Sequence, residues 1–136
     1  MVLADDHAAM LEEVSRLLQN HFTILAMVSN GEAAVQAAKD LRPDLVVMDI
    51  AMPVLNGIQA ARRMKEMGLR AKIVFLTIQN DPDYHQIAEQ LGASYVLKPM
   101  MGTDLIPAIN KTLDGYRFGP DGKGSGRAAS TGPSSG

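Results

Sequence analysis

The side chains best suited to chemistry in this sequence stand directly after its apolar runs. An ionised carboxylate is costly to bury without a partner, so the Asp that ends the run DLVVMD needs charged neighbours. Candidate neighbours occupy the same position after other apolar runs. The set comprises Asp5 and Asp6 after VLA, Asp49 after LVVM, Thr77 after KIVFL and Lys98 after SYVL.

The charges of this set indicate a metal ion. Three carboxylates carry -3 and one lysine returns +1, so a divalent cation would balance the site. Hard oxygen ligands without Cys or His favour Mg²⁺, or Mn²⁺ in its place. Beside such an ion Asp49 stays ionised and becomes a usable nucleophile. Lys98 would hold phosphoryl oxygens and Thr77 would donate a hydrogen bond to one, which suits phosphoryl transfer.

The elements that must position these side chains alternate along the chain. Continuous apolar runs at 2–5, 22–28, 45–48, 72–77 and 94–97 predict strands buried on both faces. Apolar residues at helical spacing follow each run. Five strand–helix units predict a doubly wound α/β fold, with a five-stranded parallel sheet covered by helices on both faces. In such a sheet ligands bind at the carboxyl ends of the strands, where the candidate side chains stand.

Capping signals predict where some helices begin. Ser29 with Glu32 three residues on reads as a capping box for the second helix. Asp81 before Pro82 predicts a cap followed by proline at the first helical position. One of the two acids Asp5 and Asp6 is expected to cap the first helix in part. Pro107 is expected within the first turns of the last helix, where it is tolerated.

Composition limits the function classes. The chain has 136 residues, no cysteine, 4% aromatic residues and a formal net charge of -2, which gives no bulk attraction to nucleic acid or membrane. No apolar run approaches the length of a membrane span, so a cytoplasmic protein is the expectation. Residues 1–118 are expected to form one domain. Residues 119–136, rich in Gly, Ser and Pro, read as a disordered linker or expression tail.

Four motifs in order resemble one protein family. ADDH at 4–7, DLVVMDIAMPVLNG at 44–57, FLT at 75–77 and YVLKP at 95–99 are similar to the receiver domain of bacterial two-component response regulators. The resemblance covers residues 1 to about 116. It implies a flavodoxin-like fold with strand order 2-1-3-4-5.

The resemblance also implies a role for each matching residue. Asp49 matches the phosphoacceptor, and Mg²⁺ would be held by Asp5, Asp6, Asp49 and the backbone carbonyl of Ala51. Thr77 and Lys98 match the switch hydroxyl and lysine. Tyr95 matches the aromatic that moves inward on activation, and Pro99, directly after the lysine, is expected to be a switch residue with Thr77 and Tyr95. The three histidines, at positions 7, 21 and 85, are expected at the surface.

The function implied is a switch. A sensor histidine kinase would be the phosphodonor, and phosphorylation would change the face made by the fourth helix, fifth strand and fifth helix. That face would form a homodimer or bind a partner. DNA contact would need an output domain absent from this sequence, and the bulky Ile78 after Thr77 favours receivers of helix-turn-helix regulators. The alternative is a stand-alone or non-phosphorylated receiver acting as an interaction module. An aspartyl-phosphate phosphatase would need a second acid two residues past the nucleophile, and that residue here is Ala51. A flavin-binding module would need a phosphate loop rich in Ser, Thr and Gly after the first strand, and DDHAAM is not such a loop.

Overall fold

Five strands and five α-helices alternate in the part of the chain that the computed structural model describes, residues 1–118, with only the backbone described for 115–118. The strands are β1 (Val2–Ala4), β2 (Ala26–Val28), β3 (Leu45–Met48), β4 (Lys72–Thr77) and β5 (Ser94–Leu97). The helices are α1 (Ala8–Leu18), α2 (Gly31–Leu41), α3 (Gly57–Glu66), α4 (Pro82–Gln90) and α5 (Met101–Phe118), with a 3₁₀ turn η1 (Lys98–Met100) before α5.

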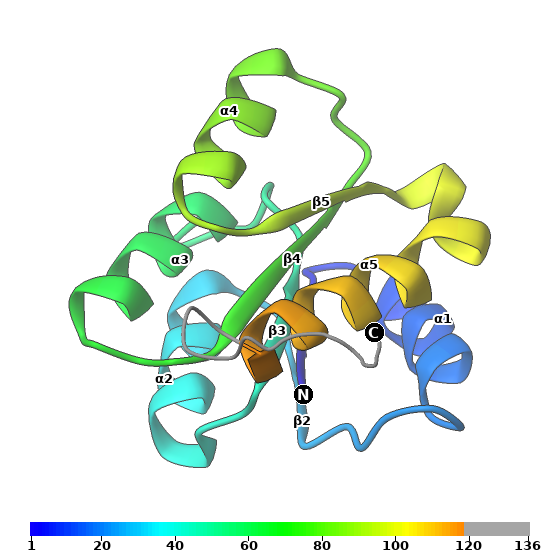
Figure 1. The fold of residues 1–136 in the computed structure, drawn as a ribbon, viewed down its shortest axis with the longest axis horizontal. Helices are drawn as coiled ribbons and strands as arrows, with labels where there is room; N and C mark the ends of the chain where they lie inside the picture. The colour runs from blue at the N-terminus through cyan, green and yellow to red at the C-terminus, as the bar shows by residue number, and fades with distance from the viewer. Residues whose placement is uncertain (119–136) are drawn as a thin grey trace.

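All four strand pairings are parallel, and the sheet order is β2-β1-β3-β4-β5. The predicted doubly wound fold and its strand order are therefore confirmed. Helices α2, α3 and α4 cover one face of the sheet, and α1 and α5 cover the other (Figure 1). None of the described helices is long and apolar enough to cross a membrane.

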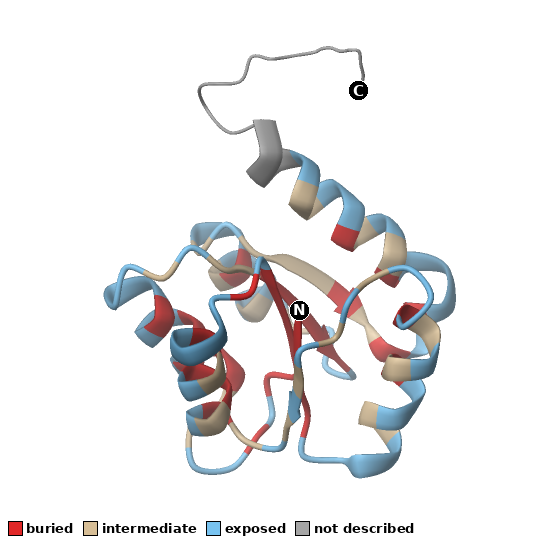
Figure 2. Ribbon diagram, turned by 90° about the horizontal axis from the view of Figure 1, so that it is seen from below, coloured by how far each residue is buried: buried red, intermediate tan, exposed pale blue. Residues whose placement is uncertain are grey.

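Alternate strand residues supply two separate core clusters. In β3, Val46 and Met48 face the α2–α3–α4 side, whereas Leu45 and Val47 face the α1–α5 side. The same alternation holds along β1 and β4. The sheet is accordingly buried on both faces, as its continuous apolar runs predict, and appears as the red centre of Figure 2.

Helix capping differs from the sequence prediction in detail. The N-cap of α2 is Asn30 and not Ser29, because the Asn30 side chain accepts a hydrogen bond from the Ala33 amide at 2.7 Å. Asp81 caps α4, with Pro82 in the first turn, as predicted. Among the described helices, a capping box lies instead at α3, between Asn56 and Gln59. Asn and Ser both suit an N-cap, so adjacent candidates cannot be separated by type alone.

The extent of one strand was predicted wrongly. Strand β2 covers only Ala26–Val28 of the expected run 22–28, because β1 supplies just three ladder partners beginning with Val2 opposite Ala26. Helix α5 begins at Met101, so Pro107 lies inside the helix in its second turn, within the first turns as predicted. The predicted tail, 119–136, lies outside the described residues.

Candidate functional site

The carboxyl ends of the two central strands bring Asp5 and Asp49 to one ammonium group. Ala4 of β1 lies opposite Met48 of β3, so the next residue of each strand stands at the same edge of the sheet. Lys98 Nζ, at the end of β5, lies 2.7 Å from Asp5 Oδ2 and 3.0 Å from Asp49 Oδ2. All three residues are buried, at 4%, 4% and 8% exposure, so the cation compensates two carboxylates that water scarcely reaches.

The remaining carboxylate oxygens accept hydrogen bonds from the backbone. Asp49 Oδ1 accepts from the amide of Ile50 at 2.7 Å, and Asp5 Oδ1 accepts from the amide of His7 at 2.9 Å. Each carboxylate is thereby fixed through both of its oxygens. A carboxylate offers about four lone-pair sites, so both groups keep lone pairs for a further partner.

Lys98 is charged in this environment. Burial alone would lower its pKa, but hydrogen bonds and attraction from Asp5 and Asp49 outweigh burial and leave the pKa above its ordinary value. An ammonium held in place between two acids is a fixed positive centre at the edge of the sheet. It can bind an additional anionic oxygen there.

The acidic residues form a group that fits a metal ion. One ligand atom each from Asp5, Asp6, His7 and Asp49 lies within 4.8 Å of the others. Carboxylate oxygens are the ligands that Mg²⁺ prefers, so the donor set agrees with the ion predicted from charge. Ala51, two residues beyond Asp49, lies exposed in the β3–α3 loop.

The N-terminus of α1 differs from the prediction. Its N-cap is His7, without a side-chain cap, so neither Asp5 nor Asp6 caps the helix. His7 is exposed, as expected of the three histidines, yet its Nδ1 lies 3.1 Å from both Asp5 Oδ1 and Asp6 Oδ1. Sequence reasoning missed this contact, because residue type and spacing do not fix the direction of an exposed imidazole.

Thr77 and Tyr95 meet at the β4–α4 loop. Thr77 is fully buried, and its Oγ1 accepts a hydrogen bond from the Gln79 amide at 3.3 Å. The Tyr95 hydroxyl donates to the Gln79 carbonyl. Burial raises the pKa of Tyr95, so its hydroxyl keeps the donated proton at neutral pH. Gln79 therefore joins the two predicted switch residues, whereas Pro99 lies exposed in η1.

Close backbone packing shapes the loop after Asp49. A Cβ on Gly57 would lie 2.2 Å from the Asp49 carbonyl oxygen, and one on Gly31 would lie 1.8 Å from the Leu55 carbonyl oxygen. Only glycine fits either position. Val54 has a left-handed backbone (φ 71°) and is 75% exposed, an uncommon conformation for a β-branched residue.

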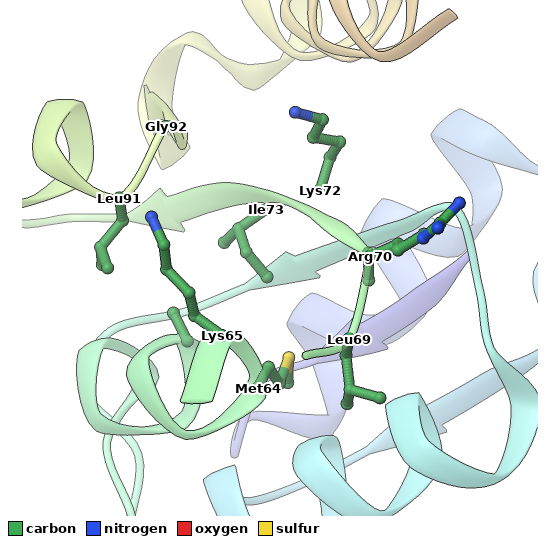
Figure 3. Close-up of a pocket in the computed structure, with 10 residues that line it drawn as sticks. Met64, Lys65, Leu69, Arg70, Lys72, Ile73, Leu91 and Gly92 are labelled. Atoms are coloured by element: carbon green, nitrogen blue, oxygen red, sulfur yellow. The ribbon is translucent and has the colours of Figure 1, made fainter. Parts of the chain in front are cut away.

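A groove of about 320 Å³ lies at the other end of β4, between α3 and α4. It contains none of the predicted site residues. Its cations include Lys65 and Arg70, whose side chains point in different directions (Figure 3). They do not converge on one point, so the carboxyl edge of the sheet remains the candidate site.

Comparisons with known proteins identify the family. The response regulator receiver domain matches residues 1–110. This chain belongs to that family. It is 34% identical over 116 residues to the chemotaxis protein CheY of Bacillus subtilis, covering 84% of this chain and 97% of CheY. It is 31% identical over 118 residues to the nitrate/nitrite response regulator protein NarL of Escherichia coli, covering 85% of this chain and 55% of NarL.

The solved structures agree with this family. A two-component response regulator of the LuxR family from Aurantimonas superposes with a TM-score of 0.78 at 29% identity, over 84% of both chains. Of the two relatives compared by sequence, this chain spans nearly all of CheY but only about half of NarL. Receiver domains of response regulators are signalling domains, and the protein is one of them.

Proposed function

We propose that the protein is a phosphorylation-activated switch whose phosphoacceptor is Asp49. The observation that carries this proposal is the buried pairing of Asp49 and Asp5 with the single ammonium of Lys98. A nucleophilic carboxylate needs positive charge beside it, both to remain ionised and to neutralise the incoming phosphoryl oxygens.

The phosphodonor is the phosphohistidine of a sensor histidine kinase. An oxygen of Asp49 attacks phosphorus, a new O–P bond forms and the P–N bond of the phosphohistidine breaks. The electron pair of that bond leaves with the imidazole nitrogen, which binds a proton. Lys98 attracts the oxygens of the transferred group, and the Thr77 hydroxyl donates a hydrogen bond to one of them.

Asp5, Asp6, Asp49 and the backbone carbonyl of Ala51 would hold Mg²⁺, or Mn²⁺ in its place. The bound ion supplies two positive charges against the acids and the phosphoryl oxygens. The close grouping of the three carboxylates supports this assignment.

Phosphorylation changes the surface through Thr77, Tyr95 and Pro99. The modified Asp49 carries about one more negative charge and additional acceptor oxygens. Thr77 turns toward this group, and its hydrogen-bonded connection through Gln79 carries the change to Tyr95. The α4–β5–α5 face then forms a homodimer or binds an output domain or partner.

The output controlled by this switch is transcription. The relatives include NarL, a response regulator about half of which aligns with this chain. Residues 1–118 would form the receiver domain of such a regulator, and any contact with DNA would be made by a separate output domain. The exposed Ile78 directly after Thr77 agrees with that subfamily.

The test is Mg²⁺-dependent phosphorylation of the full chain. Wild type and Asp49→Asn are incubated with acetyl phosphate and Mg²⁺, and acid-labile phosphate is measured by intact mass. The wild type should gain one phosphoryl group, and the variant should gain none. Glu89→Gln, an exposed acid on α4, serves as the control and should be phosphorylated like the wild type. Equal phosphorylation of Asp49→Asn would refute the assignment of the acceptor.

A receiver that acts only as an interaction module is the second candidate. It would retain the fold and its partner without accepting phosphate. Absence of phosphate on the wild type, and no binding of beryllium fluoride, would favour this candidate. The intact set of acids with Lys98 argues for phosphorylation instead.

A further inference from the structure

A ring stack joins α4 to β5 beside the predicted switch residues. The imidazole of His85, in the first turn of α4, lies on the phenol ring of Tyr95 with centroids 3.8 Å apart and planes 27° apart. His85 Nε2 also lies 2.8 Å from Asn80 Oδ1 in the β4–α4 loop. An amide oxygen only accepts hydrogen bonds, so the imidazole is the donor. His85 is thus held by the loop on one side and holds Tyr95 on the other.

The contacts continue from Tyr95 to the end of β4. The Tyr95 hydroxyl donates to the carbonyl of Gln79, and the amide of Gln79 donates to Thr77 Oγ1. Because Thr77 Oγ1 accepts in this contact, its own proton stays available for another oxygen. The position of the Tyr95 ring therefore affects the direction in which the Thr77 hydroxyl can donate its hydrogen bond.

We propose that His85 is a positioning residue for this switch. We call His85, Tyr95, Asn80 and Gln79 the His85 clasp. The clasp fixes the β4–α4 loop so that Thr77 is oriented to donate to a phosphoryl oxygen on Asp49. This inference rests on the proposed function, since it assigns His85 an effect on how tightly the site binds a phosphoryl group.

Core packing does not account for these contacts. His85, Asn80 and Gln79 are exposed, and only Tyr95 is half-buried. Substitution of exposed residues has little effect on folding in general. A stacked aromatic pair is nevertheless strong enough to change a binding constant about two- to tenfold. Because the stack is present without a ligand, its loss should lower stability slightly as well. The effect on binding arises to the extent that the clasp contacts are stronger in the phosphoryl-bound state.

The test measures the affinity of the full chain for beryllium fluoride in the presence of Mg²⁺. His85→Ala should bind the mimic about two- to tenfold more weakly than wild type. His85→Phe keeps the ring stack and should recover most of the affinity. Gln86→Ala, the exposed neighbour on α4, is the matched control and should bind like the wild type. Thermal unfolding of each variant checks that the fold is retained.

A Tyr95→Ala variant separates a positioning effect of His85 from a general disturbance of the fold. In a Tyr95→Ala chain, His85→Ala should cause no further loss, because the ring that it holds is gone. Three results would each overturn the clasp. They are wild-type affinity of His85→Ala for the mimic, a loss of affinity in His85→Phe equal to that in His85→Ala, and the same loss from His85→Ala when Tyr95 is already Ala. A wild type that binds no mimic would instead overturn the proposed function, and the clasp with it.

Discussion

Lys98 is the residue on which the electrostatics of the site depend. It is the cation that contacts both buried acids, Asp5 and Asp49. Because its pKa is raised in the folded chain, its stabilising contribution is fully present at neutral pH. That contribution is lost only as the pH rises through the raised value.

Replacing Lys98 by Met should strongly destabilise the protein in the absence of divalent ions. The variant leaves two buried carboxylates without their cation, which costs about 3–5 kcal/mol when one partner of a buried pair is removed. Urea unfolding followed by circular dichroism measures the change. Lys65→Met, at an exposed position on α3, is the control and should lie within about 0.5 kcal/mol of wild type. Equal stability of the two variants would contradict the buried ion pairs.

Val54 stores local strain that glycine should release. Its left-handed backbone and 75% exposure mean that the side chain gains little packing to offset the conformation. Val54→Gly should raise the free energy of unfolding by about 1 kcal/mol, since the strain relieved exceeds the entropy that glycine loses. Val54→Ala, which keeps a Cβ at the same φ, should bring little of this gain. A less stable Val54→Gly would show that the valine side chain has a packing role.

At the scale of the elements, the contact between α3 and the end of β3 sets the position of Asp49. Gly57 begins α3 directly against the Asp49 carbonyl oxygen, and the Gly57 amide donates to the Ile50 carbonyl at 2.8 Å. The helix therefore starts on the backbone that carries the candidate acceptor. No side chain separates the two elements at this point.

Gly57→Ala should accordingly destabilise the chain and disturb the site. The added Cβ would lie 2.2 Å from a backbone oxygen, so α3 or the β3–α3 loop must shift, at a cost of about 1–3 kcal/mol or more. Gly102→Ala is the matched control, because a Cβ there meets nothing within 4 Å in the first turn of α5. That control should be neutral or up to about 1 kcal/mol more stable. Urea unfolding of both variants gives the comparison.

The order and type of these elements could be predicted because the signals are strong and repeated. Five continuous apolar runs leave few alternatives to a covered parallel sheet, and the topology then sends Asp5, Asp49 and Lys98 to one edge. Finer features depend on geometry that residue types do not determine. Ser29 and Asn30 are equally good caps by type, and only the observed backbone selects Asn30. The stack of His85 on Tyr95 likewise requires side-chain directions.

At the scale of the whole molecule, metal binding and folding should be coupled. The acidic group brings together carboxylates from the ends of two strands, a grouping that the unfolded chain lacks. A ligand that binds only the folded chain stabilises it by about 2.7 kcal/mol at a concentration 100 times its Kd.

Mg²⁺ should therefore raise the midpoint of thermal unfolding, and the rise should grow with the logarithm of the Mg²⁺ concentration above its Kd. Asp6→Asn should weaken this response, because one of the charged ligands is lost while the fold is kept. Asp83→Asn, at an exposed position in the first turn of α4, should respond like the wild type. Titrations at constant ionic strength separate specific binding from screening. An identical response of Asp6→Asn and wild type would contradict the proposed ligands.

The two core clusters described above share no residue, because strand side chains alternate between the faces. The sheet thus separates two core clusters, and substitutions in one cluster can accumulate independently of the other. Met64→Ala on α3 and Leu105→Ala on α5 should lower the free energy of unfolding additively, to within about 0.5 kcal/mol. During evolution, the helices on one side of the sheet can therefore change to bind a new partner. The packing on the other side, and the strand ends between them, need not change with it.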